Sequence, residues 1–243
     1  MGKFLNVQFS VFSNSRIEPT AANASNLMQK INSLKKFEFL PNIISGQNFD
    51  LITGKINSIS NLSFITPSNQ SQIMCMDNRI DCIFNFSPSD NESLSEGVEF
   101  CRSILTIIMK EFSIIGNRLA LNINNISDNL NENFKESECG RKLISQLDFY
   151  NTKNLIEWST RCNTRIPIKI SNKDEFLNII TELDLTQNIG EKSKKILCHL
   201  DINTIPENQT YRFTYDKLDL FVAESNPLID SIINDFERWV SCD

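Results

Sequence analysis

The alternation of apolar and polar residues predicts β-strands in the first third of the chain. Residues 4–12 alternate regularly, which is typical of a half-buried strand. Three further strands are predicted over 62–66, 72–76 and 79–86, separated by short polar turns. These three strands are expected to form an antiparallel meander. The stretch 37–59 is less regular, with one strand expected near 51–59.

Apolar residues at steps of three and four predict amphipathic helices. Thr20 is a suitable N-cap for a helix that runs to about residue 36. A Ser-x-x-Glu capping box at 93–96 precedes a continuous apolar stripe over 94–115. Gly116 is expected to end this helix as its C′ residue. A further strand is predicted from the alternation at 119–123.

The second half of the chain repeats this alternation of helices and strands. It is predicted to contain, in order, helices at 141–149 and 155–161, a strand at 165–170, a helix opened by a capping box of Asn172 and Glu175, a strand at 194–204, and a final helix that begins at Asn226 and Pro227.

These elements predict an α+β fold in which a mainly antiparallel sheet, or two sheets, is covered by long amphipathic helices. The polar, acidic and Asn-rich stretch 127–140 is expected to be a linker or an exposed loop. It would separate an N-terminal α+β lobe, 1–126, from a C-terminal α+β lobe, 141–243. The alternative is a single domain. The strand at 79–83 and the strand at 199–202 each precede a helix, which indicates either an internal duplication or the strand-to-helix units that recur in any α+β protein.

Composition excludes several familiar sites. The chain has only seven glycines among 243 residues, and no two lie close together. A phosphate-binding loop needs clustered glycines, so none is expected. With His199 as the single histidine, neither a His-x-x-x-His pair nor a multi-histidine zinc site can form. No cofactor and no metal are therefore predicted.

Charge and cysteine content indicate a soluble cytoplasmic protein. The net charge of −6 disfavours non-specific binding of nucleic acid, which requires Lys and Arg to neutralise phosphates. The sequence has no apolar run long enough to span a bilayer and no signal-peptide pattern at its start. Its seven cysteines contain no Cys-x-x-Cys, which favours free buried thiols over disulfides or a metal site.

One local concentration of positive charge lies beside an aromatic residue and is the candidate ligand site: Trp158, Arg161, Arg165 and Lys169. Arg165 and Lys169 are four apart on a predicted strand and should point to one face. Trp158 and Arg161 are expected on a preceding helical turn beside them. Such a cluster can bind a phosphate, a carboxylate or a single-stranded base. The alternative is an ordinary surface packed by long side chains.

Strand carboxylates are a second candidate. Asp81 and Asp201 occupy matching points of two predicted strands and would be ligands of a divalent metal in a nuclease-like enzyme. The alternative is that both lie on the solvent face of half-buried strands. No Gly-x-Ser-x-Gly elbow accompanies His199, and no local signature pairs it with a cysteine.

Several strand motifs carry a resemblance to a known group of proteins. They are Leu40-Pro41-Asn42, Asn61-Leu62-Ser63-Phe64, Arg79-Ile80-Asp81, Asn117-Arg118-Leu119 and Leu200-Asp201-Ile202. In their order they loosely resemble an uncharacterised, sporadically distributed family of bacterial α+β proteins. The resemblance implies no activity and no site residue, because the family has none established.

The sequence favours a non-catalytic binding or assembly component of a bacterial multi-protein system, such as a defence or toxin-regulating operon. Its partner would be another protein or a second copy of the chain. One alternative is a divergent metal-dependent enzyme that uses the strand carboxylates. Another is a sensor of an anionic ligand or of nucleic acid that uses the basic cluster.

Overall fold

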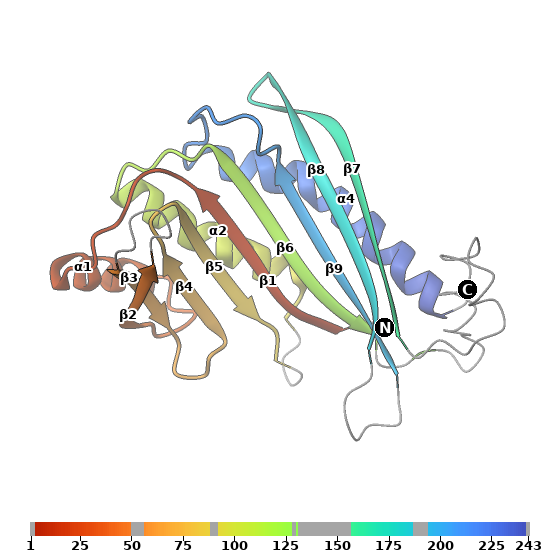
Figure 1. Cartoon of the computed structure of the whole chain (residues 1–243), viewed down its shortest axis with the longest axis horizontal. Helices are drawn as coiled ribbons and strands as arrows, with labels where there is room; N and C mark the ends of the chain where they lie inside the picture. Colours follow the sequence, from red (N-terminus) through yellow and green to blue (C-terminus); the bar gives the residue numbers. More distant parts are fainter. Residues whose placement is uncertain are drawn as a thin grey trace.

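The protein folds around one antiparallel sheet, seen in a computed structural model that describes residues 3–49, 56–87, 92–127, 130, 157–186 and 194–241. The nine strands follow the order β2-β3-β4-β5-β1-β6-β9-β8-β7 (Figure 1). They are β1 Lys3–Phe12, β2 Leu40–Phe49, β3 Ile56–Ile65, β4 Ser71–Cys75, β5 Arg79–Asn85, β6 Arg118–Ser127, β7 Trp158–Ile170, β8 Lys173–Thr186 and β9 Lys195–Thr204. The helices in the described residues are α1 Ala21–Asn32, α2 Leu94–Glu111 and α4 Lys217–Ser241.

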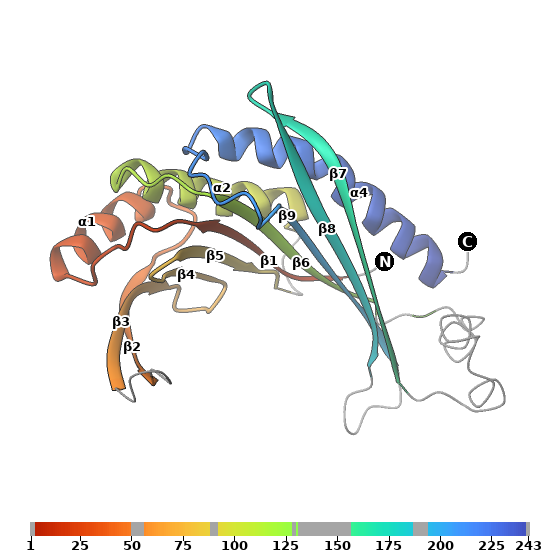
Figure 2. The same ribbon diagram turned by 45° about the horizontal axis from the view of Figure 1, so that its top comes forward.

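The helices lie on one side of this sheet (Figure 2). Helix α2 packs against β1 and β5, α4 packs against β6, β7 and β9, and α1 contacts α2 and β2. The helices hold 12, 18 and 25 residues. The predicted α+β class with an antiparallel sheet is confirmed, whereas the prediction that long amphipathic helices cover the sheet is not, because the helices are short.

Strand β1 lies at the centre and shows why the alternation in its sequence is informative. Val7, Phe9 and Val11 are completely buried against the helices. Phe9 faces Cys82 of β5 on one side and Leu121 of β6 on the other. Side chains alternate between the two faces of a strand, so the polar residues between these apolar ones point to the opposite face.

The predicted start of α2 is confirmed, and its predicted end is wrong. Ser93 and Glu96 form the complete capping box. The helix ends at Glu111, where Ser113 adopts the left-handed conformation (φ 52°) and the amide of Ile114 donates to the carbonyl of Met109 at 2.9 Å. Gly116 instead forms a β-bridge, and its lack of a side chain lets β1 approach closely.

The segment 158–186 forms two strands, although parts of it were predicted to be helical. Residues 158–161 open β7 and do not belong to a helix at 155–161, and Asn172 and Glu175 do not cap a helix. Ser171 and Asn172 have φ values of 52° and 61° and form a two-residue turn that joins β7 to β8. Two adjacent left-handed residues favour a hairpin, because their twist matches that of the flanking strands.

Helix α4 begins at Lys217, ten residues before the predicted start at Asn226 and Pro227. Pro227 lies inside the helix, where it removes one backbone hydrogen bond. Leu218 and Phe221, which precede it, are fully buried. The burial of this first part of the helix against the sheet outweighs the loss at the proline.

The two predicted lobes share one sheet, because β6 pairs with β1 on one side and with β9 on the other. The boundaries at 126 and 141 stay a prediction: Ser127 ends β6, and residues 131–156, with the predicted helix 141–149, lie outside the described residues. None of the described helices is long and apolar enough to cross a membrane.

The described cysteines are free thiols. Cys75, Cys82, Cys101 and Cys198 are buried, and Cys162 on β7 is exposed. Burial raises the pKa of Cys75 and of Cys198 to about 12. These buried thiols are therefore uncharged at neutral pH and pack as small apolar side chains.

Candidate functional site

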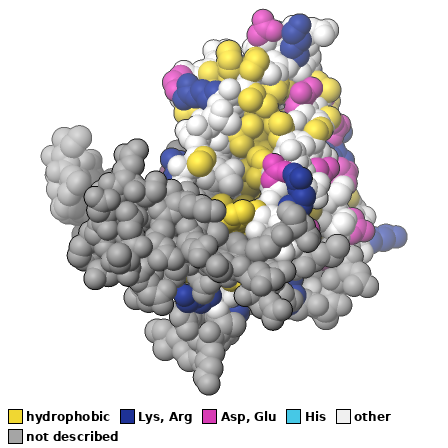
Figure 3. Space-filling model, turned by 90° about the vertical axis from the view of Figure 1, so that its right-hand side faces the viewer, with side chains coloured by type: hydrophobic (Ala, Val, Ile, Leu, Met, Phe, Trp, Pro, Cys, Tyr) yellow, Lys and Arg dark blue, Asp and Glu magenta, His cyan; other side chains and the backbone are white. Residues whose placement is uncertain are grey.

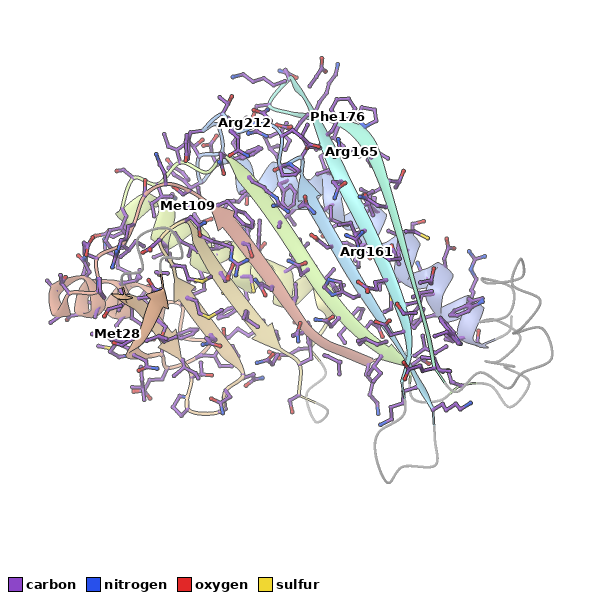
Figure 4. The ribbon with its side chains drawn as sticks, viewed as in Figure 1. Met28, Met109, Arg161, Arg165, Phe176 and Arg212 are labelled. Atoms are coloured by element: carbon purple, nitrogen blue, oxygen red, sulfur yellow. The ribbon has the colours of Figure 1, made fainter. Side chains whose placement is uncertain are left out.

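The structure places the three cations of the predicted basic cluster along the edge strand β7. Arg161, Arg165 and Lys169 are four residues apart, so all three point to the same face of the sheet. Arg165 donates through Nη2 to Glu207 Oε1 at 2.5 Å. Figure 4 shows Arg161 and Arg165 spaced along the strand rather than gathered around one point.

Trp158 lies on the opposite face and does not join these cations. Its ring meets that of Trp239 on α4, with centroids 6.1 Å apart and planes at 70°. Together with Leu183 it packs on a small apolar cluster between the sheet and α4. Figure 3 shows hydrophobic side chains gathered on this side of the molecule. The prediction that Trp158 and Arg161 share a helical turn is wrong, because a strand sends residues three apart to opposite faces.

The face of the sheet opposite α2 and α4, called the open face from here on, is polar along its central strands. Residues paired across neighbouring strands point to the same side of the sheet. The open-face residues of β1, β6 and β9 are mostly amides, hydroxyls and titratable groups: Asn6, Gln8, Ser10, Asn122, Asn124, His199, Asp201 and Asn203. The open face therefore offers many hydrogen-bonding groups.

At one end of the open face, two arginines flank one aromatic ring. Arg118 of β6 and Arg79 of β5 both lie directly opposite Phe12 of β1. The Arg118 guanidinium carbon is 4.7 Å from the centre of the Phe12 ring, and that of Arg79 is 5.7 Å from it. Both are cation–π distances, so the ring holds the two positive charges in place.

A pocket opens beside the row formed by Arg79, Phe12 and Arg118, and this pocket is called the Arg118 pocket from here on. Its volume is about 270 Å³, and it is lined by Phe12, Ser13, Asn14, Asn78, Asn117, Arg118, Pro206, Gln209 and Tyr211. The lining comes from the end of β1, the β4–β5 turn, the start of β6 and the loop between β9 and α4. The pocket therefore depends on segments that are distant in the sequence.

Arg212 fixes the loop that forms one wall of the Arg118 pocket (Figure 4). Its Nε donates to Glu175 Oε2 at 2.6 Å. Its Nη1 donates to the carbonyls of Asn117 at 2.5 Å, Thr210 at 2.8 Å and Asn208 at 3.0 Å. These bonds tie the loop to the start of β6, so the two walls keep a fixed spacing.

Two buried polar atoms at the Arg118 pocket have no hydrogen-bond partner in the described part of the chain. They are Arg118 Nε and Asn117 Oδ1. Leaving a buried polar atom unpaired costs about 1–3 kcal/mol. Both atoms belong to side chains that line the Arg118 pocket, so a ligand reaches the atoms themselves only if these side chains shift.

Asp81 lies beside this row and is completely buried, contrary to the expectation of a solvent-facing carboxylate. The Ser10 hydroxyl donates to its Oδ1 at 2.6 Å, and Arg79 Nε lies 3.0 Å from its Oδ2. Burial raises the pKa of Asp81, and the Ser10 hydrogen bond and the Arg79 charge oppose that rise. Asp81 therefore holds Arg79 in position.

Asp81 and Asp201 do not converge on one metal ion. They lie on β5 and β9, which are separated by β1 and β6. At about 4.8 Å per strand spacing, the two strands are roughly 14 Å apart, too far for both carboxylates to reach one ion. Asp201 Oδ1 accepts from Asn203 at 2.9 Å. Within the described ranges, no group of three or more His, Cys, Asp or Glu side chains is placed to hold a metal ion.

His199 belongs to a row of amides at the other end of the open face. Its Nδ1 lies 2.8 Å from Asn124 Oδ1, and Asn124 Nδ2 donates to Asn6 Oδ1 at 2.9 Å. Because the amide oxygen accepts, Nδ1 of His199 is the donor. The neighbouring Cys198 is buried on the helix side, so the two do not form a nucleophilic dyad.

The residues that sequence reasoning missed are Arg118 and Phe12. Arg118 stands in one of the motifs that carried the family resemblance, Asn117-Arg118-Leu119, and Arg79 stands in another, Arg79-Ile80-Asp81. Both motifs lie next to β1, so the structure brings them together at the Arg118 pocket. The only signal in the sequence was the motifs themselves, since nothing in a strand pattern shows which strands pair.

Comparison with known proteins adds no assignment: no protein-family model matches the chain, and no curated protein matches it.

Proposed function

We propose that the protein is a non-catalytic binding or assembly component, and that the open face of its sheet contacts the partner. The observation that carries this proposal is the row of half-buried amide side chains on the central strands, among them Gln8, Asn122 and Asn124. Amide side chains both donate and accept hydrogen bonds, and because they are uncharged, a partner can bind them without desolvating an ion. The partner is another protein or a second copy of the chain.

We also propose that the fold combines two similar α+β units, β1 to α2 with five strands and β6 to α4 with four. In each unit the first strand lies beside the last, which leads into a helix packed on both. Asp81 lies opposite Ser10, and Asp201 lies opposite Asn122. The units meet at the β1–β6 pair, so the open face spans both of them. Membership of a bacterial defence or toxin-regulating system remains a proposal from the sequence.

The experiment is a matched pair of asparagine-to-arginine variants. Asn122→Arg adds a long charged side chain to the open face, and Asn234→Arg adds the same side chain to an exposed position of α4. Tagged full chains purified from the native host are compared for a co-purifying partner, and their mass in solution is measured by light scattering. We expect Asn122→Arg to lose the partner or the self-association and Asn234→Arg to keep it.

Two results would contradict the proposal. One is a folded Asn122→Arg variant that associates as the wild type does. The other is a wild-type chain that stays monomeric and purifies alone. Circular dichroism and the thermal midpoint verify that both variants are folded. Gln8→Arg, two strand positions from Ser10, serves as a second open-face variant if Asn122→Arg does not fold.

The alternative of an anion sensor has one observation in its favour, the pair of arginines at the Arg118 pocket. The alternative of a metal-dependent enzyme requires ligands other than the pair Asp81 and Asp201.

A further inference from the structure

We infer that the Arg118 pocket binds an oxyanion group, a carboxylate or a phosphate, that the partner or a small ligand presents to the open face. The inference deepens the proposed function and rests on it, because it assigns the chemistry of one contact on the proposed binding face. Carboxylate and phosphate share the geometry that an arginine fork recognises.

Arg118 lines the pocket and is held by an aromatic ring rather than by a carboxylate. Its guanidinium carbon lies 4.7 Å from the centre of the Phe12 ring. This cation–π contact positions the charge without neutralising it. Arg118 Nε is buried without a hydrogen-bond partner, and no ion pair joins Arg118 to a carboxylate in the part of the chain that the structure describes.

The nearby carboxylates are each engaged by another cation. Glu207 is bound by Arg165 at 2.5 Å, and Asp81 is paired with Arg79. Arg118 is close enough to contribute to lowering the pKa of Glu207, but the main cause of that lowering is the Arg165 hydrogen bond. Arg212 at the pocket wall is likewise paired with Glu175, so among the described arginines here the one without a carboxylate partner is Arg118.

Neutral side chains around Arg118 can complete the coordination of an oxyanion. Asn14, Asn78, Gln209 and Tyr211 line the pocket, and the Gln209 amide already bonds to Pro206 and Asn117. Amide N–H and hydroxyl groups both donate hydrogen bonds to anionic oxygen. A volume of about 270 Å³ leaves room for the oxyanion and for a part of the group that carries it.

The pocket is already in shape before a ligand binds. The amide of Asn117 donates to the carbonyl of Phe12 at 2.9 Å, and the amide of Ser13 donates to the carbonyl of Asn78 at 3.0 Å. The Ser13 hydroxyl donates to the carbonyl of Ile115 at 3.0 Å. These bonds join three of the segments that line the pocket, so binding needs little ordering of the chain.

The test is an NMR titration of the full chain with inorganic phosphate and with acetate, at constant ionic strength set by chloride. The arginine Nε–Hε signals report a change at each guanidinium group, and assignment by Arg118→Lys identifies the signal of Arg118. We expect that signal to shift and saturate. Arg118→Lys keeps the charge but loses the fork, and should weaken binding about tenfold or more.

Two further variants test the effect of a nearby negative charge and the response of an unrelated arginine. Glu207→Gln removes a nearby negative charge and should strengthen binding, because less repulsion opposes the anion. Arg238 is the matched control, since it is an exposed arginine on α4 that pairs with Asp235. Arg238→Lys should leave the titration of Arg118 unchanged.

The outcomes separate this inference from the proposed function. Shifts that do not saturate, or that are equal at Arg118 and Arg238, indicate an adventitious ion only and overturn the inference. Unchanged affinity in a folded Arg118→Lys variant overturns it as well. If Asn122→Arg abolishes association while phosphate and acetate fail to bind, the binding face stands and the oxyanion site does not. If Asn122→Arg associates normally while Arg118 binds phosphate, the oxyanion site stands and the proposed binding face does not.

Discussion

Asp81 has no exposed surface, although it lies on the face of the sheet that carries no described helix. The Ser10 hydroxyl, the Arg79 guanidinium and the pairing of β5 with β1 and β4 enclose it. A carboxylate in this position is stabilised by its partners and destabilised by the loss of water. Burial is the larger effect, and it raises the pKa of Asp81 above the ordinary 3.8.

This raised pKa predicts how stability varies with pH. The folded protein holds the Asp81 proton more tightly than the unfolded chain does, so the contribution of this proton to stability is complete below 3.8 and is lost as pH rises through the folded-state pKa. We expect the wild type to lose stability relative to Asp81→Asn over that range, measured as the difference in urea midpoint. A difference that moves in favour of the wild type as pH rises would mean that the Arg79 pair outweighs burial.

At the scale of elements, Gly116 shows that a glycine can be required by close approach rather than by a turn. A Cβ atom at this position would lie 2.9 Å from Val11 Cγ1 and 3.2 Å from the carbonyl oxygen of Phe12. We expect Gly116→Ala to cost about 1–3 kcal/mol in the free energy of unfolding, because the strand must shift. Gly46→Ala is the matched control: among the described atoms outside its chain neighbours, none lies within 4 Å of the added Cβ, so the change should be neutral or slightly stabilising. Equal effects of the two substitutions would contradict this account.

The β7–β8 turn leads to a second prediction at this scale. Asn172 has φ 61°, a conformation that glycine adopts freely and a β-branched residue does not. Asn172→Val should therefore destabilise the protein by about 1–2 kcal/mol, whereas Asn172→Gly should be tolerated. Urea unfolding of both variants measures the difference. Equal stability of the two variants would contradict the left-handed conformation of Asn172 in the turn.

For the whole molecule, the shared sheet predicts cooperative unfolding. Strand β6 pairs with β1 and β9, and residues of both proposed units belong to one buried core. Neither unit can unfold without exposing the apolar side of the other. We expect one calorimetric transition with equal calorimetric and van't Hoff enthalpies. Two resolved transitions would instead support independent lobes divided near residues 127–140.

The sequence by itself determined those elements whose causes lie within a few residues. The alternation of β1, the Thr20 cap of α1, the β3–β5 meander and the capping box of α2 all agree with the structure. Each depends on a repeat of two or of three to four residues, or on a cap at fixed spacing. The same local interpretation failed at 172–183, because Leu177, Ile180 and Leu183 fit a helical repeat although they lie on the two different faces of strand β8.

Only the tertiary structure decided which strands are neighbours, and with them the candidate site. Phe12, Arg79 and Arg118 are 39 to 106 residues apart in the chain and lie in one row because β1 pairs with both β5 and β6. The loop that completes the pocket is held by Arg212, which lies 95 residues beyond its hydrogen-bond partner Asn117. No periodicity records such pairings, since the free energy that selects them comes from burying apolar faces of the whole sheet against its helices.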